Sequence, residues 1–189
     1  MRLVGGRLLA VVCAPALVLT GCGGPTQGSP IASGDASTKS TTVAAGPEPF
    51  DPCTIPKSAV TASGLDVSTE RPDFAGIGTY PGWKNCTWDG PSGKPWYYLA
   101  VMSSKNSIDE YLNSPQNDRQ VPVRVGSRDA VRYHAPYQSD LPDGCDIALD
   151  AGGNLIIFKL DTIGSEETVG DPCREVSRHA SDLEAFLPK

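Results

Sequence analysis

The sequence lacks the short motifs that mark the common enzyme classes. It contains no G-x-S-x-G, no H-E-x-x-H, no phosphate-binding G-x-x-x-x-G-K and no G-x-G-x-x-G. It has only two histidines, and we predict that His134 and His179 are ordinary surface or boundary residues rather than bases or ligands. Acidic side chains are frequent, but no spacing singles out an acid–base pair. The sequence therefore predicts a protein that is not an enzyme and needs no cofactor.

The sequence also lacks an excess of basic residues. The full chain has 16 Lys and Arg against 22 Asp and Glu. Two of the 16, Arg2 and Arg7, lie in a segment that we expect to be removed, so 14 remain and the net charge becomes −8. Such a chain does not attract nucleic acid or an anionic lipid surface as a general partner. We predict no nucleic-acid partner.

No apolar run reaches the roughly 20 residues that a transmembrane helix needs. The most apolar stretch, at 8–19, follows two arginines and ends at Leu19-Thr20-Gly21-Cys22. A charged start followed by a short apolar stretch is typical of a signal peptide. A buried helix beginning at residue 8 is the alternative. It explains neither the arginines nor the Gly/Pro/Ser-rich sequence that follows.

The residues Leu19-Thr20-Gly21-Cys22 resemble the lipobox of bacterial lipoproteins. This resemblance implies cleavage before Cys22, a diacylglyceryl group on its thiol, and often a further acyl chain on its new amine. Each buried CH₂ contributes about 0.8 kcal/mol, and stable anchoring takes about two chains. We therefore predict a signal peptide at 1–21 and a lipid anchor on Cys22. The protein would be held at the outer, extracytoplasmic face of the cell membrane.

Residues 22–49 combine this acylated cysteine with a Gly/Pro/Ser/Thr-rich stretch that contains no aromatic residue. Such a composition predicts a flexible tether. The Ser/Thr cluster at 37–42 is consistent with a plain solvated linker or with O-linked sugar. The remaining residues, 50–189, have the length of a single domain.

Within that domain, Asp-Pro-Cys occurs at 51–53 and again at 171–173. Asp caps the first amides of a helix and Pro suits its first position, so both tripeptides predict helix starts. Pro56 restarts the first helix, and Ser107-x-x-Glu110 predicts a short middle helix. Period-two patterns predict strands at 83–89, 95–102, 120–125, 129–135, 144–150 and 155–161. The fold class is α+β, with N-terminal, middle and C-terminal helices packed on a mainly antiparallel sheet.

The chain has six cysteines. Four remain after Cys13 is removed with the predicted signal peptide and Cys22 is lipidated, and an even number outside the cytoplasm favours disulfides. Four cysteines allow three pairings. We favour Cys53–Cys86 and Cys145–Cys173, which join neighbours in the sequence. No C-x₂-C pair exists, so we predict no metal site.

The cysteine motifs and the ends of the domain resemble one family. The segments that carry the resemblance are Phe50-Asp51-Pro52-Cys53, Cys86-Thr87-Trp88, Cys145, Asp171-Pro172-Cys173 and Leu187-Pro188. They are similar to small actinobacterial lipoproteins, many mycobacterial or nocardial, that share a domain of unknown function. That family implies an envelope location and a disulfide framework but no established activity. Pro56 departs from its pattern. A fainter likeness is to the outer sensor domains of some mycobacterial serine/threonine kinases.

Two stretches, 96–102 and 155–160, are apolar on both faces. Such strands need cover on both sides, which helices provide unless one face lines a groove. We predict a candidate ligand groove at Trp96, Tyr98 and Phe158. The function predicted from the sequence is a membrane-anchored module that binds a lipid, a glycan or another envelope ligand. The alternatives are a lipoprotein that binds or scaffolds a partner protein, and an accessory sensor domain.

Overall fold

A computed structural model of the chain describes residues 47–73, 80–115, 117–134 and 144–189. The predicted signal peptide, the predicted lipidation site Cys22 and the predicted tether up to residue 46 lie outside the described residues. Within them, no helix combines the length and the apolar character needed to cross a membrane.

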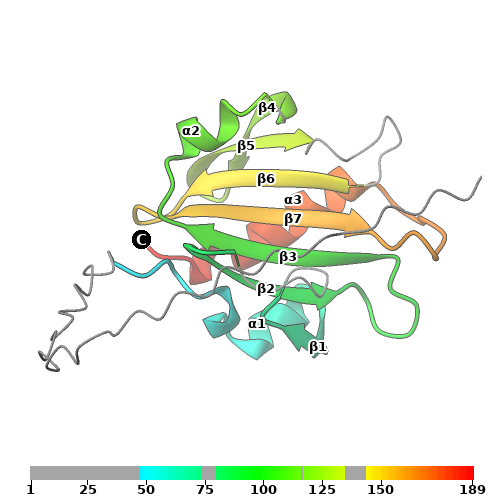
Figure 1. The fold of residues 1–189 in the computed structure, drawn as a ribbon. Coiled ribbons are helices and arrows are strands. Elements are labelled where there is room, and N and C mark those ends of the chain that lie inside the picture. Colours follow the sequence, from blue (N-terminus) through cyan, green and yellow to red (C-terminus); the bar gives the residue numbers. More distant parts are fainter. Residues whose placement is uncertain (1–46, 74–79, 116, 135–143) are drawn as a thin grey trace, which may run out of the picture. The chain divides into compact units, whose positions relative to one another are not determined.

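The described residues contain one antiparallel sheet of seven strands, in the order β1-β2-β3-β7-β6-β5-β4 (Figure 1). The strands are β1 (Asp66–Arg71), β2 (Trp83–Asp89), β3 (Tyr97–Ser104), β4 (Asp118–Val125), β5 (Arg128–His134), β6 (Gly144–Asp150) and β7 (Leu155–Thr162). β2 and β6 have the predicted bounds, and the ends of β3, β4, β5 and β7 shift by at most two residues. The predicted antiparallel sheet is confirmed.

The sequence does not predict β1, because five of its six residues are polar or charged. It lies at the edge of the sheet and pairs only with β2, with an irregular register between Asp66 and Arg71. An edge strand with mostly half-exposed side chains needs no alternation of apolar residues. Long-range pairing forms β1, and no local pattern signals it.

The helices are few, and only α3 exceeds two turns. They are η1 (Pro52–Thr54), α1 (Lys57–Ala62), α2 (Ile108–Leu112), α3 (Pro172–Leu183) and η2 (Glu184–Phe186). The predicted caps are present: the Asp51 carboxylate accepts from the Cys53 amide at 3.0 Å, and the Asp171 carboxylate accepts from the Cys173 amide at 2.9 Å. Pro56 splits the first helical segment into one 3₁₀ turn and α1. The N-terminal helix is therefore shorter than a continuous one from residue 52 would be.

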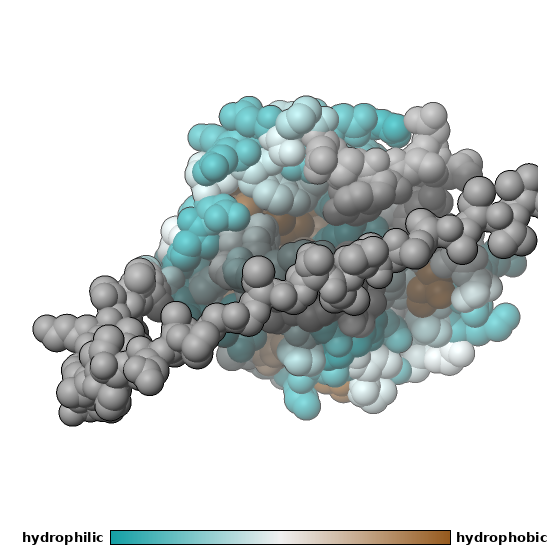
Figure 2. All heavy atoms as spheres, viewed as in Figure 1, coloured by the Kyte–Doolittle hydropathy of each residue, from teal (hydrophilic) through white to brown (hydrophobic). Residues whose placement is uncertain are grey.

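The two faces of the sheet carry different cover. α3 packs across β6 and β7 on one face (Figure 1), where Trp88, Leu99, Phe158, Val176 and Leu183 belong to the larger core cluster. On the other face, Leu112 of α2 joins a smaller cluster with Tyr133, Ala148 and Ile157. The part of the described surface that is visible in Figure 2 is mainly hydrophilic, with a few small hydrophobic patches. Helical cover thus accounts for central strands that are apolar on both sides.

Both disulfides have the predicted pairing. Cys53–Cys86 joins η1 to β2, and Cys145–Cys173 joins β6 to the start of α3. They span 33 and 28 residues. By the chain-entropy estimate, closing loops of this length stabilises the folded state by about 3–4 kcal/mol each.

Candidate functional site

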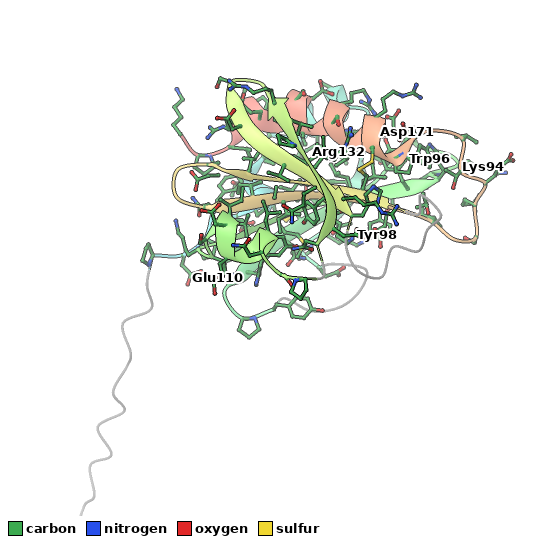
Figure 3. The ribbon with its side chains drawn as sticks, turned by 90° about the horizontal axis from the view of Figure 1, so that it is seen from above. Lys94, Trp96, Tyr98, Glu110, Arg132 and Asp171 are labelled. Carbon is green, nitrogen blue, oxygen red and sulfur yellow. A yellow bond between two sulfur atoms is a disulfide. The ribbon has the colours of Figure 1, made fainter. Side chains whose placement is uncertain are left out.

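The three residues predicted to line a ligand groove do not share a surface. Phe158 is fully buried in the core beneath α3, and Trp96 is only 8 % exposed. Trp96 packs edge-on against Tyr97, with ring centroids 4.7 Å apart, and lies beside Asp171 at the start of α3 (Figure 3). A Cβ on Gly170 would approach the Trp96 ring to 2.8 Å, so this glycine permits close packing. The predicted groove is wrong at Trp96 and Phe158 because α3 covers that face.

Tyr98 lies on the opposite face, since side chains alternate along β3. Its hydroxyl donates to Asp161 at 3.0 Å, and the ammonium of Lys159 lies 3.0 Å from Asp161 and 3.5 Å from Asp146. Lys159 and Asp146 are almost completely buried. Burial, and then the Asp161 charge, raises the pKa of Tyr98, so its hydroxyl stays protonated. This group is a buried ion network across β3, β7 and β6, which favours one register of these strands.

His179 is not the surface or boundary residue that the sequence predicts. It is fully buried, with Nδ1 2.6 Å from the Ser63 hydroxyl and Nε2 2.8 Å from the Tyr97 hydroxyl. Burial, and then the nearby Arg178 charge, lowers the pKa of His179 to about 3, so the ring is neutral. Ser63 is equally inaccessible. The Ser63–His179 pair therefore ties α3 to the end of α1 and to β3, and no substrate reaches it.

His134 is partly buried and lies close to the Cys145–Cys173 disulfide. Its nitrogen and the two sulfur atoms fall within 4.8 Å of one another. Both sulfurs are bonded to each other, so they are not thiolate ligands. This grouping is a disulfide with a histidine beside it.

An open groove of about 660 Å³ lies at one end of the β2–β3 pair. It is lined by Pro47, Glu48, Pro49, Tyr80, Pro81, Gly82, Trp83, Lys84, Lys105 and Asn106. Three separate segments meet there: the last residues before the domain, the turn that enters β2, and the residues that follow β3. Its volume lies within the range of pockets that hold small ligands, about 300–1,000 Å³.

The turn at 80–83 presents two aromatic side chains to the groove. The Trp83 amide donates to the Tyr80 carbonyl at 3.0 Å, and Gly82 has a φ of +79°. Proline at the second position and a positive φ at the third define a type II turn, which requires glycine there. This turn places Tyr80 and Trp83 at its two ends. Tyr80 is 51 % exposed.

Trp83 is held in place from α2. Its ring meets the Tyr111 ring edge-on, with centroids 6.0 Å apart, and the hydroxyls of Tyr111 and Tyr133 lie 3.1 Å apart. One side of the indole is thereby fixed, while the residue remains partly exposed. A preorganised aromatic side chain contributes contact area to a ligand at little cost in conformational entropy.

The groove carries two lysines and one carboxylate. The ammonium of Lys84 lies 3.3 Å from the Glu48 carboxylate, and Lys105 donates to the Gly153 carbonyl at 3.5 Å. The segment that contains Glu48 is attached to the domain two residues later, where the Phe50 amide donates to the Asn154 side-chain oxygen at 3.0 Å. The groove is thus a positively charged spot on a chain whose net charge is negative.

The geometry defines a disulfide-stapled α+β domain with a surface groove where the chain enters it. Residues 17–185 match the family model described as "Protein of unknown function (DUF3558)", so the chain belongs to that family. No curated protein and no solved structure matches the chain.

The sequence does not predict a groove at any of these residues. One signal was available: Tyr80-Pro81-Gly82-Trp83 is a turn sequence flanked by two aromatic residues. The lysines carry no signal of their own, since single lysines at strand ends are ordinary surface residues.

Proposed function

We propose that this protein is a lipid-anchored module at the outer face of the cell membrane, and that the groove at Tyr80, Trp83, Lys84 and Lys105 binds an envelope ligand. The observation that carries the proposal is the place of this groove. It lies where the predicted tether joins the domain, and residues 47–49 form one of its walls. The cleavage and acylation at Cys22 remain predictions from the lipobox.

The tether sets the reach of the groove. Residues 22–46 number 25, and a flexible chain of that length has a root-mean-square span of about 25–30 Å. The groove would typically lie about this distance from the lipid anchor, and a fully extended tether would reach about 80–90 Å. Its ligand is then a component of the envelope near the membrane, either a lipid, a glycan or a segment of an envelope protein.

The described residues favour a ligand groove over a broad protein-binding surface. Only four large apolar side chains among the described residues are exposed, and they are Tyr80, Val121, Val169 and Phe186. Surfaces that bind partner proteins are contiguous apolar patches of several hundred Å². A scaffolding or sensor role is the second candidate, and it rests on the sequence resemblance. We propose no catalytic role, cofactor, metal or nucleic-acid partner.

Two experiments test the two parts of the proposal. Cys22→Ala should release the protein from the membrane fraction and remove the acyl mass, whereas Cys22→Ala that stays in that fraction with unchanged mass contradicts the anchor. For the groove, mass spectrometry of gently purified wild-type protein should detect a co-purifying ligand. Tyr80→Ala should lose that ligand and Val169→Ala should retain it. Equal retention by both variants contradicts the groove.

A further inference from the structure

We propose that the groove selects a sugar that carries a phosphate or carboxylate group, and that the Glu48 carboxylate occupies the anion position until such a ligand displaces it. This inference rests on the proposed function and names its ligand class. It is drawn from the pairing of aromatic rings with lysines in one groove.

The aromatic pair favours a ring-shaped partner with one apolar face. Tyr80 and Trp83 stand at the two ends of a rigid type II turn, and Trp83 is braced by Tyr111. The C–H face of a pyranose ring stacks on such aromatic surfaces, while its hydroxyls stay available for polar contacts. An acyl chain fits less well, because it offers no polar partner to the lysines and the carboxylate that line the groove.

The lysines favour an anionic substituent on that sugar. Lys84, on β2, and Lys105, just after β3, both line the groove, so an anionic group bound there is attracted by two ammonium charges. Each ammonium has three donors, and a phosphate carries up to two negative charges and three acceptor oxygens. The ligand's anion would therefore pair with both lysines.

Glu48 already makes the contact that this anion would make. Its carboxylate lies 3.3 Å from Lys84, and both side chains are substantially exposed. Exposed ion pairs contribute little to stability, so a ligand with more charge displaces the carboxylate readily. Ligand binding would therefore release the Glu48–Lys84 contact, while the hydrogen bond from Phe50 to Asn154 still holds this segment to the domain.

Trp83 provides a built-in reporter for the test. The other two tryptophans, Trp88 and Trp96, are buried, whereas Trp83 lines the groove. Acrylamide, a neutral quencher, should therefore act mainly on Trp83, and a ligand in the groove should protect it. The probes are an oligomannoside bearing one phosphate, the same oligomannoside without phosphate, inorganic phosphate, and phosphatidylinositol-containing vesicles.

We expect saturable protection by the phosphorylated oligomannoside, weaker protection by the neutral one, and none by inorganic phosphate alone. Lys84→Gln should weaken binding about tenfold, the loss of one charge-assisted hydrogen bond. Lys94→Gln is the matched control, because Lys94 is exposed in the connection at the opposite end of the β2–β3 pair (Figure 3), and it should leave binding unchanged.

A Glu48 variant tests whether the ligand's anion displaces the Glu48 carboxylate or is attracted only by the overall charge of the protein. Glu48→Gln removes the competing carboxylate and should strengthen binding about two- to fivefold. Glu110→Gln, which removes an exposed carboxylate on α2, should not (Figure 3). Unchanged or weaker binding by Glu48→Gln contradicts the displacement.

The remaining outcomes distinguish this inference from the proposed function. Protection by vesicles or by the neutral oligomannoside, without preference for the phosphorylated form, overturns the anionic sugar and leaves a ligand groove. If no probe protects Trp83 and wild-type protein carries no co-purifying ligand that Tyr80→Ala loses, both the inference and the proposed function fail.

Discussion

Two regions of this domain combine aromatic and ionisable side chains, and they differ in what covers them. Under α3, Tyr97 packs against both Trp96 and a neutral His179, and all three residues are buried. At the other end of the β2–β3 pair, Tyr80 and Trp83 meet Lys84 in an open groove. The residue types are similar, but a twelve-residue helix closes the first region and nothing comparable in the described residues closes the second. Exposure, rather than composition, separates the buried cluster from the groove that we propose as a binding site.

The largest expected difference between the two regions is in stability. Trp96→Ala should lower the free energy of unfolding by about 3–5 kcal/mol, because it leaves a cavity beneath α3. The measurement is urea denaturation followed by far-UV circular dichroism. A loss below about 1 kcal/mol would mean that Trp96 is not part of the core. The variant should leave ligand protection of Trp83 unchanged under conditions where the protein stays folded.

The Cys145–Cys173 disulfide, which joins β6 to the start of α3, should contribute nearly as much to the free energy of unfolding as Trp96 does. Replacing both Cys145 and Cys173 by Ala removes a 28-residue loop closure and should cost about 3–4 kcal/mol. Removing both sulfurs avoids a free thiol that would react. Thermal melts of the double variant, beside those of wild-type protein, measure the effect. An unchanged melting temperature would show that α3 needs no covalent attachment to the sheet.

The buried His179 under α3 should also make the free energy of unfolding depend on pH. Burial lowers the folded-state pKa of His179 to about 3, below the unfolded value of about 6.5. Between these values the unfolded state binds more protons, so stability falls as the pH drops, by up to about 1.4 kcal/mol per pH unit. Denaturation at several pH values between 4 and 7 should show a shallower dependence for His179→Gln than for wild-type protein.

The other histidine provides the control for that experiment. His134 is partly exposed, and burial followed by the Arg119 charge lowers its pKa as well. We expect His134→Gln to change the pH dependence less than His179→Gln does. An equal change in both variants would contradict the prediction that the burial of His179 dominates the pH dependence.

The smallest expected effect on stability belongs to the open region. Tyr80→Ala removes a side chain that is 51 % exposed, and should change the free energy of unfolding by no more than about 0.5 kcal/mol. Its effect on ligand retention should nevertheless be large. Urea denaturation beside the co-purification assay compares the two quantities. A large destabilisation would show that Tyr80 belongs to the core and that the groove is part of the folded interior.

The sequence predicts those parts of the fold that have local signals. Asp51 and Asp171 act as helix caps through contacts two residues away, and the alternation of apolar residues reveals the central strands. The favoured cysteine pairing, which joins neighbours in the sequence, is the one that the structure has. These features depend on neighbours in the sequence, so they can be inferred without the tertiary structure.

The sequence does not predict features that distant segments create together. His179 is buried by partners 116 and 82 residues away, Ser63 and Tyr97. Trp96 looks the same in sequence whether a helix covers it or leaves it exposed. The groove combines segments near 48, 82 and 105, none of which carries a recognisable motif for binding. Its aromatic turn was readable, but its lysines acquire meaning only when the fold brings them together.

The Cys53–Cys86 bond has a mechanical consequence. A pull on the chain at residue 47 would enter β2 through that disulfide and bypass α1 and β1, which lie between the two cysteines in the sequence. Lys84 in the groove lies two residues from Cys86, so the load path between the tether and a ligand held there is short and partly covalent. Force would pass from the anchor to the ligand while most of the domain bears no tension. Reduction of this one bond would reroute that force through α1 and the edge strand β1, the most easily peeled part of the sheet.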